Sequence, residues 1–156
     1  MVEGSSAAQQ KEADEMRARL ATDSTDVQAR VRLADILYDT ANWPEAIIHY
    51  RSAVRTDSNL VNAIVDLGVC YYNLGVQSQA ERHFELALAK DPHQPVALFN
   101  LGIVHEARGD AKGALEYFHR ALQSGPPDKM REPLLAAMQR AQEKAGVTPA
   151  PLPDGR

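Results

Sequence analysis

The sequence has one cysteine in 156 residues and no long hydrophobic run. A single cysteine cannot form an intramolecular disulfide, so the fold does not depend on an oxidising compartment. No stretch approaches the roughly eighteen apolar residues that a membrane-spanning helix needs, and we expect no membrane contact by this segment. The first residues also lack the charged and apolar regions of a secretory signal. These absences favour the cytoplasm, and they leave open the water-exposed part of an anchored or exported protein.

An excess of basic residues is absent as well. The chain carries 17 Lys and Arg against 21 Asp and Glu, which gives a formal net charge of -4. Nucleic-acid phosphates are bound by clustered Lys and Arg, which release counterions on binding. Because the basic residues here alternate with acidic ones, we expect no nucleic-acid partner.

The motifs of common catalytic and metal sites are missing too. There is no glycine-rich phosphate loop, no nucleophile elbow and no paired-histidine zinc helix. Cys70 lies on an inward-facing stretch, where a small side chain is usually packing material. His49 and His83 lie far apart in the chain, and neither has a second His or Cys one helical turn away. We therefore predict no catalytic residue, no metal and no cofactor, and the chain is not expected to be an enzyme.

What the sequence has in abundance is repetition, at a period of 34 residues. A set of apolar, small, aromatic and proline positions recurs one period later, as Leu67, Gly68, Tyr71, Gly75, Ala80, Phe84, Ala87 and Pro92, then Leu101, Gly102, His105, Gly109, Ala114, Phe118, Ala121 and Pro126. A looser copy precedes them, with Ala41 in place of glycine and Ser58 in place of proline. This pattern resembles the tetratricopeptide repeat, a helix-turn-helix unit of about that length.

The resemblance implies an all-α fold, a right-handed α-solenoid of three tandem helix-turn-helix repeats. The predicted repeats cover residues 27–60, 61–94 and 95–128. Residues 7–26 are interpreted as an N-terminal helix, the second half of a degenerate repeat, and residues 129–146 as a C-terminal capping helix. We expect residues 1–6 to be disordered or a remnant of cloning, and residues 147–156 to form a flexible proline-rich tail.

Three local signals concern the ends of helices. Gly75 and Gly109 occupy the turn inside two repeats, where glycine tolerates the left-handed conformation. Ala41 stands at the same place in the first repeat, so we expect its turn to be made differently. Asn42 indicates an N-cap with a glutamate three residues later. Pro133 is expected in the first turn of the last helix.

In proteins of this family, the first helices of the repeats line a concave groove that usually holds an extended peptide or a partner's helix. The resemblance therefore implies a peptide-binding groove formed by Val31, Arg32, Asp35, Tyr38, Asn62, Val65, Asp66, Val69, Tyr72, Asn73, Phe99, Asn100, Ile103 and Glu106. Among them, Val31, Val65 and Phe99 occupy equivalent positions and are expected to form an exposed apolar stripe.

The chemistry of these side chains suits a peptide with basic residues. Asn side chains can pair with a ligand backbone whatever its sequence. Four acidic side chains in or beside the groove face only one basic residue, Arg32, so we expect a ligand that carries Lys or Arg. The family's best-known groove is a clamp of Lys, Asn, Asn, Lys and Arg for the C-terminal carboxylate of heat-shock chaperones. The residues at the corresponding positions of this sequence are Val31, Asp35, Asp66, Val96 and Asn100. None of them matches the clamp residue at its position, so we do not expect a chaperone tail as partner.

The sequence thus predicts a non-enzymatic scaffold that binds a peptide or protein segment and helps to assemble a multiprotein complex. Two alternatives stay open. The chain could be a self-assembling structural module, or a docking domain cut from a larger or membrane-anchored protein. The sequence does not name the partner.

Overall fold

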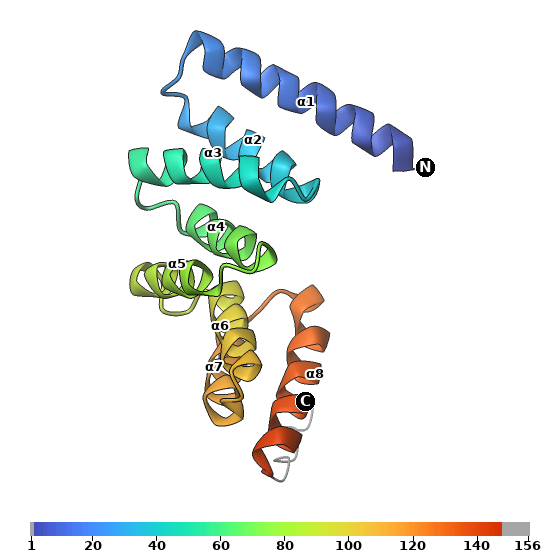
Figure 1. Cartoon of the computed structure of the whole chain (residues 1–156), viewed down its shortest axis with the longest axis vertical. Helices are drawn as coiled ribbons and strands as arrows, with labels where there is room; N and C mark the ends of the chain where they lie inside the picture. Colours follow the sequence, from blue (N-terminus) through green and yellow to red (C-terminus); the bar gives the residue numbers. More distant parts are fainter. Residues whose placement is uncertain (1, 148–156) are drawn as a thin grey trace. The chain divides into compact units, whose positions relative to one another are not determined.

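The computed structural model describes residues 2–147, with side chains from residue 6 onward. Within this range the chain forms eight helices and no strand (Figure 1). The expected all-α fold of helical repeats is confirmed. The chain divides into two compact units, one reaching to Lys90 and the other beginning at Asp91. The handedness of a superhelix across both units stays a prediction.

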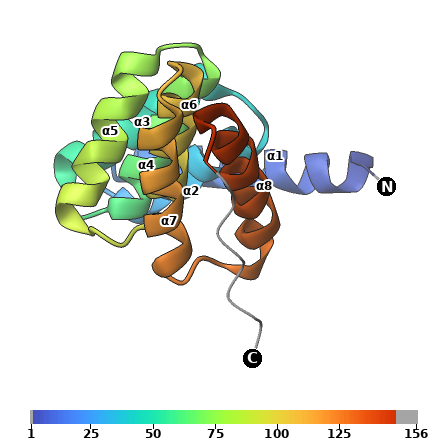
Figure 2. The same cartoon turned by 90° about the horizontal axis from the view of Figure 1, so that it is seen from below.

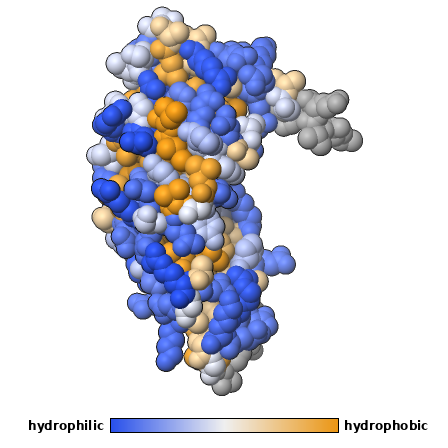
Figure 3. Space-filling model, in the orientation of Figure 1, coloured by the Kyte–Doolittle hydropathy of each residue, from blue (hydrophilic) through white to orange (hydrophobic). Residues whose placement is uncertain are grey.

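The first unit contains five helices, in which each helix packs against the next along the chain. They are α1 (Val2–Thr22), α2 (Val27–Asp39), α3 (Trp43–Thr56), α4 (Val61–Asn73) and α5 (Gln77–Lys90). Helix α4 also contacts α2, whereas α3 and α5 do not pack on each other. Figure 3 shows hydrophobic surface bordered by hydrophilic side chains over the region of α2 to α4.

Alternating large and small side chains bring the paired helices together. Tyr50 and Phe84 are 1% and 0% exposed, and each is the central aromatic residue of the second helix of its pair. Gly68 on α4 faces this aromatic position, because a Cβ atom added there would lie 2.6 Å from Cε1 of Phe84. The small residues of the repeat therefore make room for the aromatic rings.

The turn between α2 and α3 corrects one expectation. Ala41 adopts a left-handed conformation with φ of 57°, close to the 76° of Gly75 at the equivalent place. The first turn is thus made in the same way as the second, with alanine tolerated in a glycine conformation. Asn42 precedes α3 as its N-cap residue, but its side chain caps no backbone amide. Its Nδ2 instead donates to Oε2 of Glu45 at 2.9 Å.

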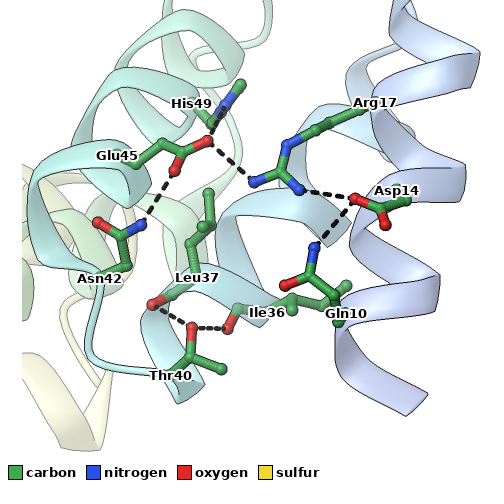
Figure 4. A network of polar contacts seen from close by, with 9 residues as sticks. All are labelled: Gln10, Asp14, Arg17, Ile36, Leu37, Thr40, Asn42, Glu45 and His49. Carbon is green, nitrogen blue, oxygen red and sulfur yellow. Dashed lines mark hydrogen bonds and ion pairs between the residues drawn. The ribbon is translucent and has the colours of Figure 1, made fainter. Parts of the chain in front are cut away.

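Helix α1 begins at Val2, so residues 2–6 are helical rather than disordered. It buries Ala13 and Met16 in the core that it shares with α2 and α3. Figures 1 and 2 show its N-terminal part extending past the other helices of the first unit. Ion pairs also join α1 to its neighbours. Arg17 bridges Asp14 on its own helix and Glu45 on α3, both at 3.1 Å (Figure 4).

The second unit contains three helices, α6 (Pro95–Ala107), α7 (Ala111–Gln123) and α8 (Asp128–Ala145). Helix α8 packs mainly on α7 and also contacts α6. It buries Leu134, Ala137, Met138 and Ala141 on one face, as expected of a helix that covers the preceding pair. Because α8 begins at Asp128, Pro133 lies in its second turn, not in its first as expected. The predicted flexible tail lies outside the described residues, apart from Val147.

Candidate functional site

A pocket of about 380 Å³ lies in the first unit, between the first helices of its two pairs. Helix α2 and helix α4 supply most of its lining, and the aromatic core residue of α3 supplies the rest: Val31, Asp35, Tyr38, Asp39, Tyr50, Asn62, Ala63 and Asp66. We call this the acidic pocket, because it gathers three carboxyl groups and no basic side chain.

None of these three carboxyl groups forms an ion pair with a described residue. The nearby Arg32 does not neutralise them by contact. Its Nε and Nη2 donate to the two carboxylate oxygens of Glu12 on α1, at 2.6 and 2.8 Å. The only basic residue predicted for this part of the groove is therefore held by a bidentate pair outside the pocket.

The electrostatics of the pocket follow from this arrangement. Burial, together with the negative charges of Asp35 and Asp39, raises the pKa of Asp66 to about 7. Burial also raises the pKa of Asp35, although a hydrogen bond from the Tyr50 hydroxyl at 2.8 Å opposes the change. Partly buried carboxylates that repel one another retain protons more readily than isolated ones. A cation in the pocket would relieve this repulsion.

Tyr38 forms an aromatic side of the pocket. Its ring packs edge-on against Trp43, with ring centroids 5.3 Å apart and an angle of 81°. Burial, followed by the charge of Asp66, raises the pKa of Tyr38 to about 12, so its hydroxyl stays protonated and can donate a hydrogen bond. The pocket thus offers apolar ring surface beside carboxylate acceptors.

Five of the predicted groove residues line this pocket: Val31, Asp35, Tyr38, Asn62 and Asp66. Val65 does not belong to an exposed stripe, because it is 2% exposed and part of the core. The remaining predicted residues of the first unit, Val69, Tyr72 and Asn73, lie on α4 outside the pocket lining. The amide of Asn73 donates to the Val69 carbonyl at 3.0 Å.

The other predicted groove residues lie on α6 in the second unit: Phe99, Asn100, Ile103 and Glu106. Phe99 packs on Phe118 with ring centroids 5.8 Å apart. The Asn100 amide donates to the Val96 carbonyl at 2.8 Å.

Glu106 differs from the carboxyl groups of the first unit because it is neutralised. Its side chain is 8% exposed and accepts from Arg140 at 3.2 Å and from Lys144 at 2.9 Å, both on α8. Burial alone would raise the pKa of Glu106, but these two partners outweigh it and hold the pKa below its ordinary value. Among the predicted groove residues, acidic side chains without a cationic partner therefore occur only in the acidic pocket.

Two lining residues, Tyr50 and Ala63, were not predicted to belong to the groove, whereas Asp39 is one of the four acidic side chains expected in or beside it. Asp39 follows Asp35 by four residues, so helical spacing already placed both on one face of α2. Tyr50 occupies a core position of the repeat. The sequence predicts that its ring is buried, but it does not predict that its hydroxyl reaches the pocket.

The described residues hold no group of three or more His, Cys, Asp and Glu side chains suited to a metal ion. Among the described helices, none is both long and apolar enough to cross a membrane. Cys70 is fully buried, and burial together with the charge of Asp66 raises the pKa of its thiol to about 12. A thiol in this state is a poor nucleophile at neutral pH.

Comparison with known proteins agrees with the fold. Residues 66–129 match the family model of the tetratricopeptide repeat. No curated protein shows significant similarity to the chain.

Solved structures with a similar fold include that of MamA, with 18% sequence identity, a TM-score of 0.69 and coverage of 86% of each chain. The Yersinia enterocolitica type III secretion chaperone SycD, in complex with a peptide of the translocator YopD, has 14% identity and a TM-score of 0.70, covering 76% of this chain and 93% of that chain. The first tetratricopeptide repeat domain of Spaghetti (RPAP3), bound to the HSP90 peptide SRMEEVD, has 18% identity and a TM-score of 0.70, covering 80% of this chain and 96% of that chain.

Proposed function

We propose that this chain, in which residues 66–129 match the tetratricopeptide-repeat family model, is a non-enzymatic scaffold that binds a segment of another protein. The acidic pocket of the first unit receives a Lys or Arg side chain of that segment. Binding of this kind would help to assemble a multiprotein complex, and the cytoplasm remains the predicted compartment.

One observation carries the proposal. The pocket collects Asp35, Asp39 and Asp66 from two helices, and no described cation pairs with any of them. A half-buried carboxylate without a partner is costly, and an opposite charge within a few ångströms favours its ionised form. A ligand ammonium or guanidinium group would provide that charge and could donate hydrogen bonds to the carboxylates of the pocket. The stem of a long basic side chain would lie against the ring of Tyr38.

The similar structures support peptide binding as the type of function, and the charge of the pocket favours a basic peptide. SycD and the RPAP3 domain each appear with a bound peptide. The peptide SRMEEVD carries two Glu and one Asp. Since this pocket is acidic, it would repel such a sequence, and we expect a basic ligand instead.

The remaining groove residues keep their proposed role in a longer binding surface. Val69, Tyr72 and Asn73 on α4 would contact the ligand beside its basic residue. Asn100 and Ile103 on α6 are proposed as ligand contacts of the second unit taken by itself. The carbonyl oxygens of the two Asn side chains are suited to ligand backbone amides, since their amide nitrogens already donate to helix carbonyls.

Random peptides displayed on phage provide the direct test. Peptides retained by the wild-type chain would be synthesised and titrated by calorimetry, with SRMEEVD as an acidic comparison. We expect the retained peptides to be enriched in Lys and Arg, their affinity to fall with added salt, and SRMEEVD not to bind. The double variant Asp39→Asn, Asp66→Asn should weaken binding about tenfold or more.

A matched control removes the same number of charges elsewhere on the first unit. Glu15 on α1 and Glu85 on α5 are exposed and form no ion pair with described residues. Glu15→Gln, Glu85→Gln should leave the affinity within about twofold. If both double variants weaken binding equally, the effect comes from the net charge of the chain and not from the acidic pocket. Selection of acidic peptides would contradict the proposal outright.

A further inference from the structure

The outer side of the first unit has a second hollow, of about 380 Å³, which the groove does not include. It lies between α3 and α5, which both pack on α4 and not on each other. Its lining comes from all three helices: Arg51, Tyr71, Gln79, Arg82, His83 and Leu86. A smaller hollow of about 260 Å³ continues along α3, where it is lined by Ile48, Arg51 and Arg55. Arg51 is common to both hollows.

Aromatic rings form part of the larger hollow. Tyr71 and His83 stack with ring centroids 5.2 Å apart and an angle of 28°. Nδ1 of His83 lies 2.7 Å from the Gln79 carbonyl oxygen, so this nitrogen carries the proton. Burial lowers the pKa of His83, the hydrogen bond to the Gln79 carbonyl opposes this change, and the positive charges of Arg82 and Arg51 lower the pKa further. The imidazole is therefore neutral at pH 7.

The three arginines of this surface are unpaired among the described residues. Arg51, Arg55 and Arg82 form neither an ion pair nor a side-chain hydrogen bond there, unlike Arg17, Arg19, Arg32 and Arg140. No acidic side chain lines either hollow. A chain of negative net charge thus has a local region of uncompensated positive charge.

Two large apolar side chains accompany these arginines. Ile48 is 64% exposed and Leu86 is 42% exposed, and they lie on the two helices that border the larger hollow. Ile48, Arg51 and Arg55 follow one another at helical spacing on α3, as do Arg82 and Leu86 on α5. We call these five residues the arginine face.

We propose that the arginine face is a docking surface for an acidic amphipathic segment of a partner protein, and that it acts independently of the acidic pocket. Carboxylate side chains of the segment pair with Arg51 and Arg82 at the hollow, and its apolar side chains cover Ile48 and Leu86. Guanidinium groups bind carboxylates through two parallel hydrogen bonds, which gives such a contact geometric specificity.

The shape of this surface favours a protein segment over other anionic partners. A flat bilayer would leave the hollow between α3 and α5 empty, whereas a narrow segment can insert side chains between the two arginines. Duplex nucleic acid requires more clustered cations than three arginines beside two exposed apolar side chains. Charge complementarity and mixed polarity together fit an amphipathic helix with acidic residues.

The test uses a synthetic helical peptide with Leu at every third or fourth position and Glu at the others. Its binding to the whole chain would be measured by calorimetry, and its position by methyl NMR signals of Ile48 and Leu86. We expect saturable binding that shifts both signals. Arg51→Glu, Arg82→Glu should weaken binding about tenfold or more, and Arg51→Lys, Arg82→Lys should retain part of it.

Three comparisons make the result specific. Lys129→Glu, Arg131→Glu makes the same charge change at exposed, unpaired positions on α8 and should leave the affinity nearly unchanged. Asp39→Asn, Asp66→Asn should also leave it unchanged, so this result does not depend on the proposed function of the acidic pocket. The same peptide with Gln in place of Glu should bind at least about tenfold more weakly.

Several outcomes would overturn the proposal. They are absence of saturable binding to the wild type, equal binding of the Gln peptide, or equal loss in the α8 control. Binding of anionic phosphatidylglycerol vesicles that requires Arg51 and Arg82, without binding of the peptide, would assign the face to a membrane instead.

Discussion

Ala41 illustrates how a single residue can depart from a repeat without changing its backbone. The repeat uses glycine in the turn between paired helices, and Gly75 and Gly109 have φ values of 76° and 82°. Ala41 adopts 57° at the same place. Because its Cβ then crowds the following carbonyl, the left-handed conformation costs an alanine about 1–2 kcal/mol. The two flanking helices stabilise this conformation.

Ala41→Gly should therefore stabilise the first unit. Relief of the steric cost exceeds the additional backbone entropy that glycine loses on folding, and we expect a net gain of about 0.5–1 kcal/mol in the free energy of unfolding. Urea denaturation followed by circular dichroism measures it. Ala18→Gly, at an exposed position inside α1, is the control and should lose about 1 kcal/mol. A loss of stability in Ala41→Gly would show that the alanine is not strained.

Residue types predicted the paired packing but not every side-chain environment. Small residues opposite aromatic ones at a fixed period already indicated close helix contacts, and Gly68 against Phe84 is such a contact. The spacing of His49 and His83 in the sequence argued against both as ligands of a metal ion. In the structure both are half-buried, and burial lowers the pKa of each imidazole. Helical spacing identifies the face on which a side chain lies, but not what a neighbouring helix places beside it.

At the scale of elements, the terminal helices show where local signals suffice and where they fail. Helix α8 ends at Ala145, and its C-cap residue Gly146 has a positive φ of 66°, a conformation that favours glycine. Its start lies earlier than the signal of Pro133 suggested, because Asp128 already belongs to the first turn after Pro127. The Arg32–Glu12 pair could not be predicted either, since it joins residues 20 positions apart on two helices.

Helix α8 is held to α6 by charge as well as by apolar contact. Arg140 and Lys144 both reach the buried carboxylate of Glu106. Arg140→Ala, Lys144→Ala would leave that carboxylate without its cations, and we expect α8 to be destabilised by about 1–2 kcal/mol. Hydrogen exchange of the α8 backbone amides should become faster.

The control for this pair lies near the other end of the same helix. Lys129→Ala, Arg131→Ala removes two exposed cations that pair with no described residue. Exchange in this variant should match the wild type. If both double variants accelerate exchange equally, the helix responds to lost charge in general and not to the loss of the partners of Glu106.

Over the whole chain, the sum of charges conceals how the charges are distributed. The net charge of -4 describes neither the acidic pocket nor the arginine face. Both surfaces belong to the first unit. The acidic pocket lies mainly between α2 and α4, and the arginine face lies on α3 and α5. The all-α repeat fold could be predicted from periodicity, because the same residue types recur at equivalent positions of each repeat. The distribution of charge could not, because Glu12 and Arg140 remove predicted groove charges through contacts between helices.

The stability of the first unit should accordingly depend on pH through Asp66. Its pKa is about 7 in the folded chain against an ordinary value of 3.8. Between these values the folded state holds a proton that the unfolded state releases, so this group makes stability fall as pH rises. Asp66→Asn lacks the ionisable group, and should exceed the wild type in stability by about 1–2 kcal/mol at pH 8. The difference should vanish near pH 4, where both states of the wild type bind the proton.

Urea denaturation of both proteins between pH 4 and pH 8 isolates this contribution, because the carboxyl groups with lowered pKa, such as those of Glu12 and Asp26, are common to both. Their stabilising effect is lost as pH falls, which is the opposite sign, and it cancels in the difference. Glu15→Gln removes one exposed carboxylate that forms no ion pair with a described residue, and its stability should stay within about 0.5 kcal/mol of the wild type. A difference for Asp66→Asn that stays constant across this range would mean that Asp66 is already ionised at pH 4. In that case a cationic ligand would gain nothing from relieving the repulsion in the pocket, and its affinity would not fall as pH is lowered from 8 to 5.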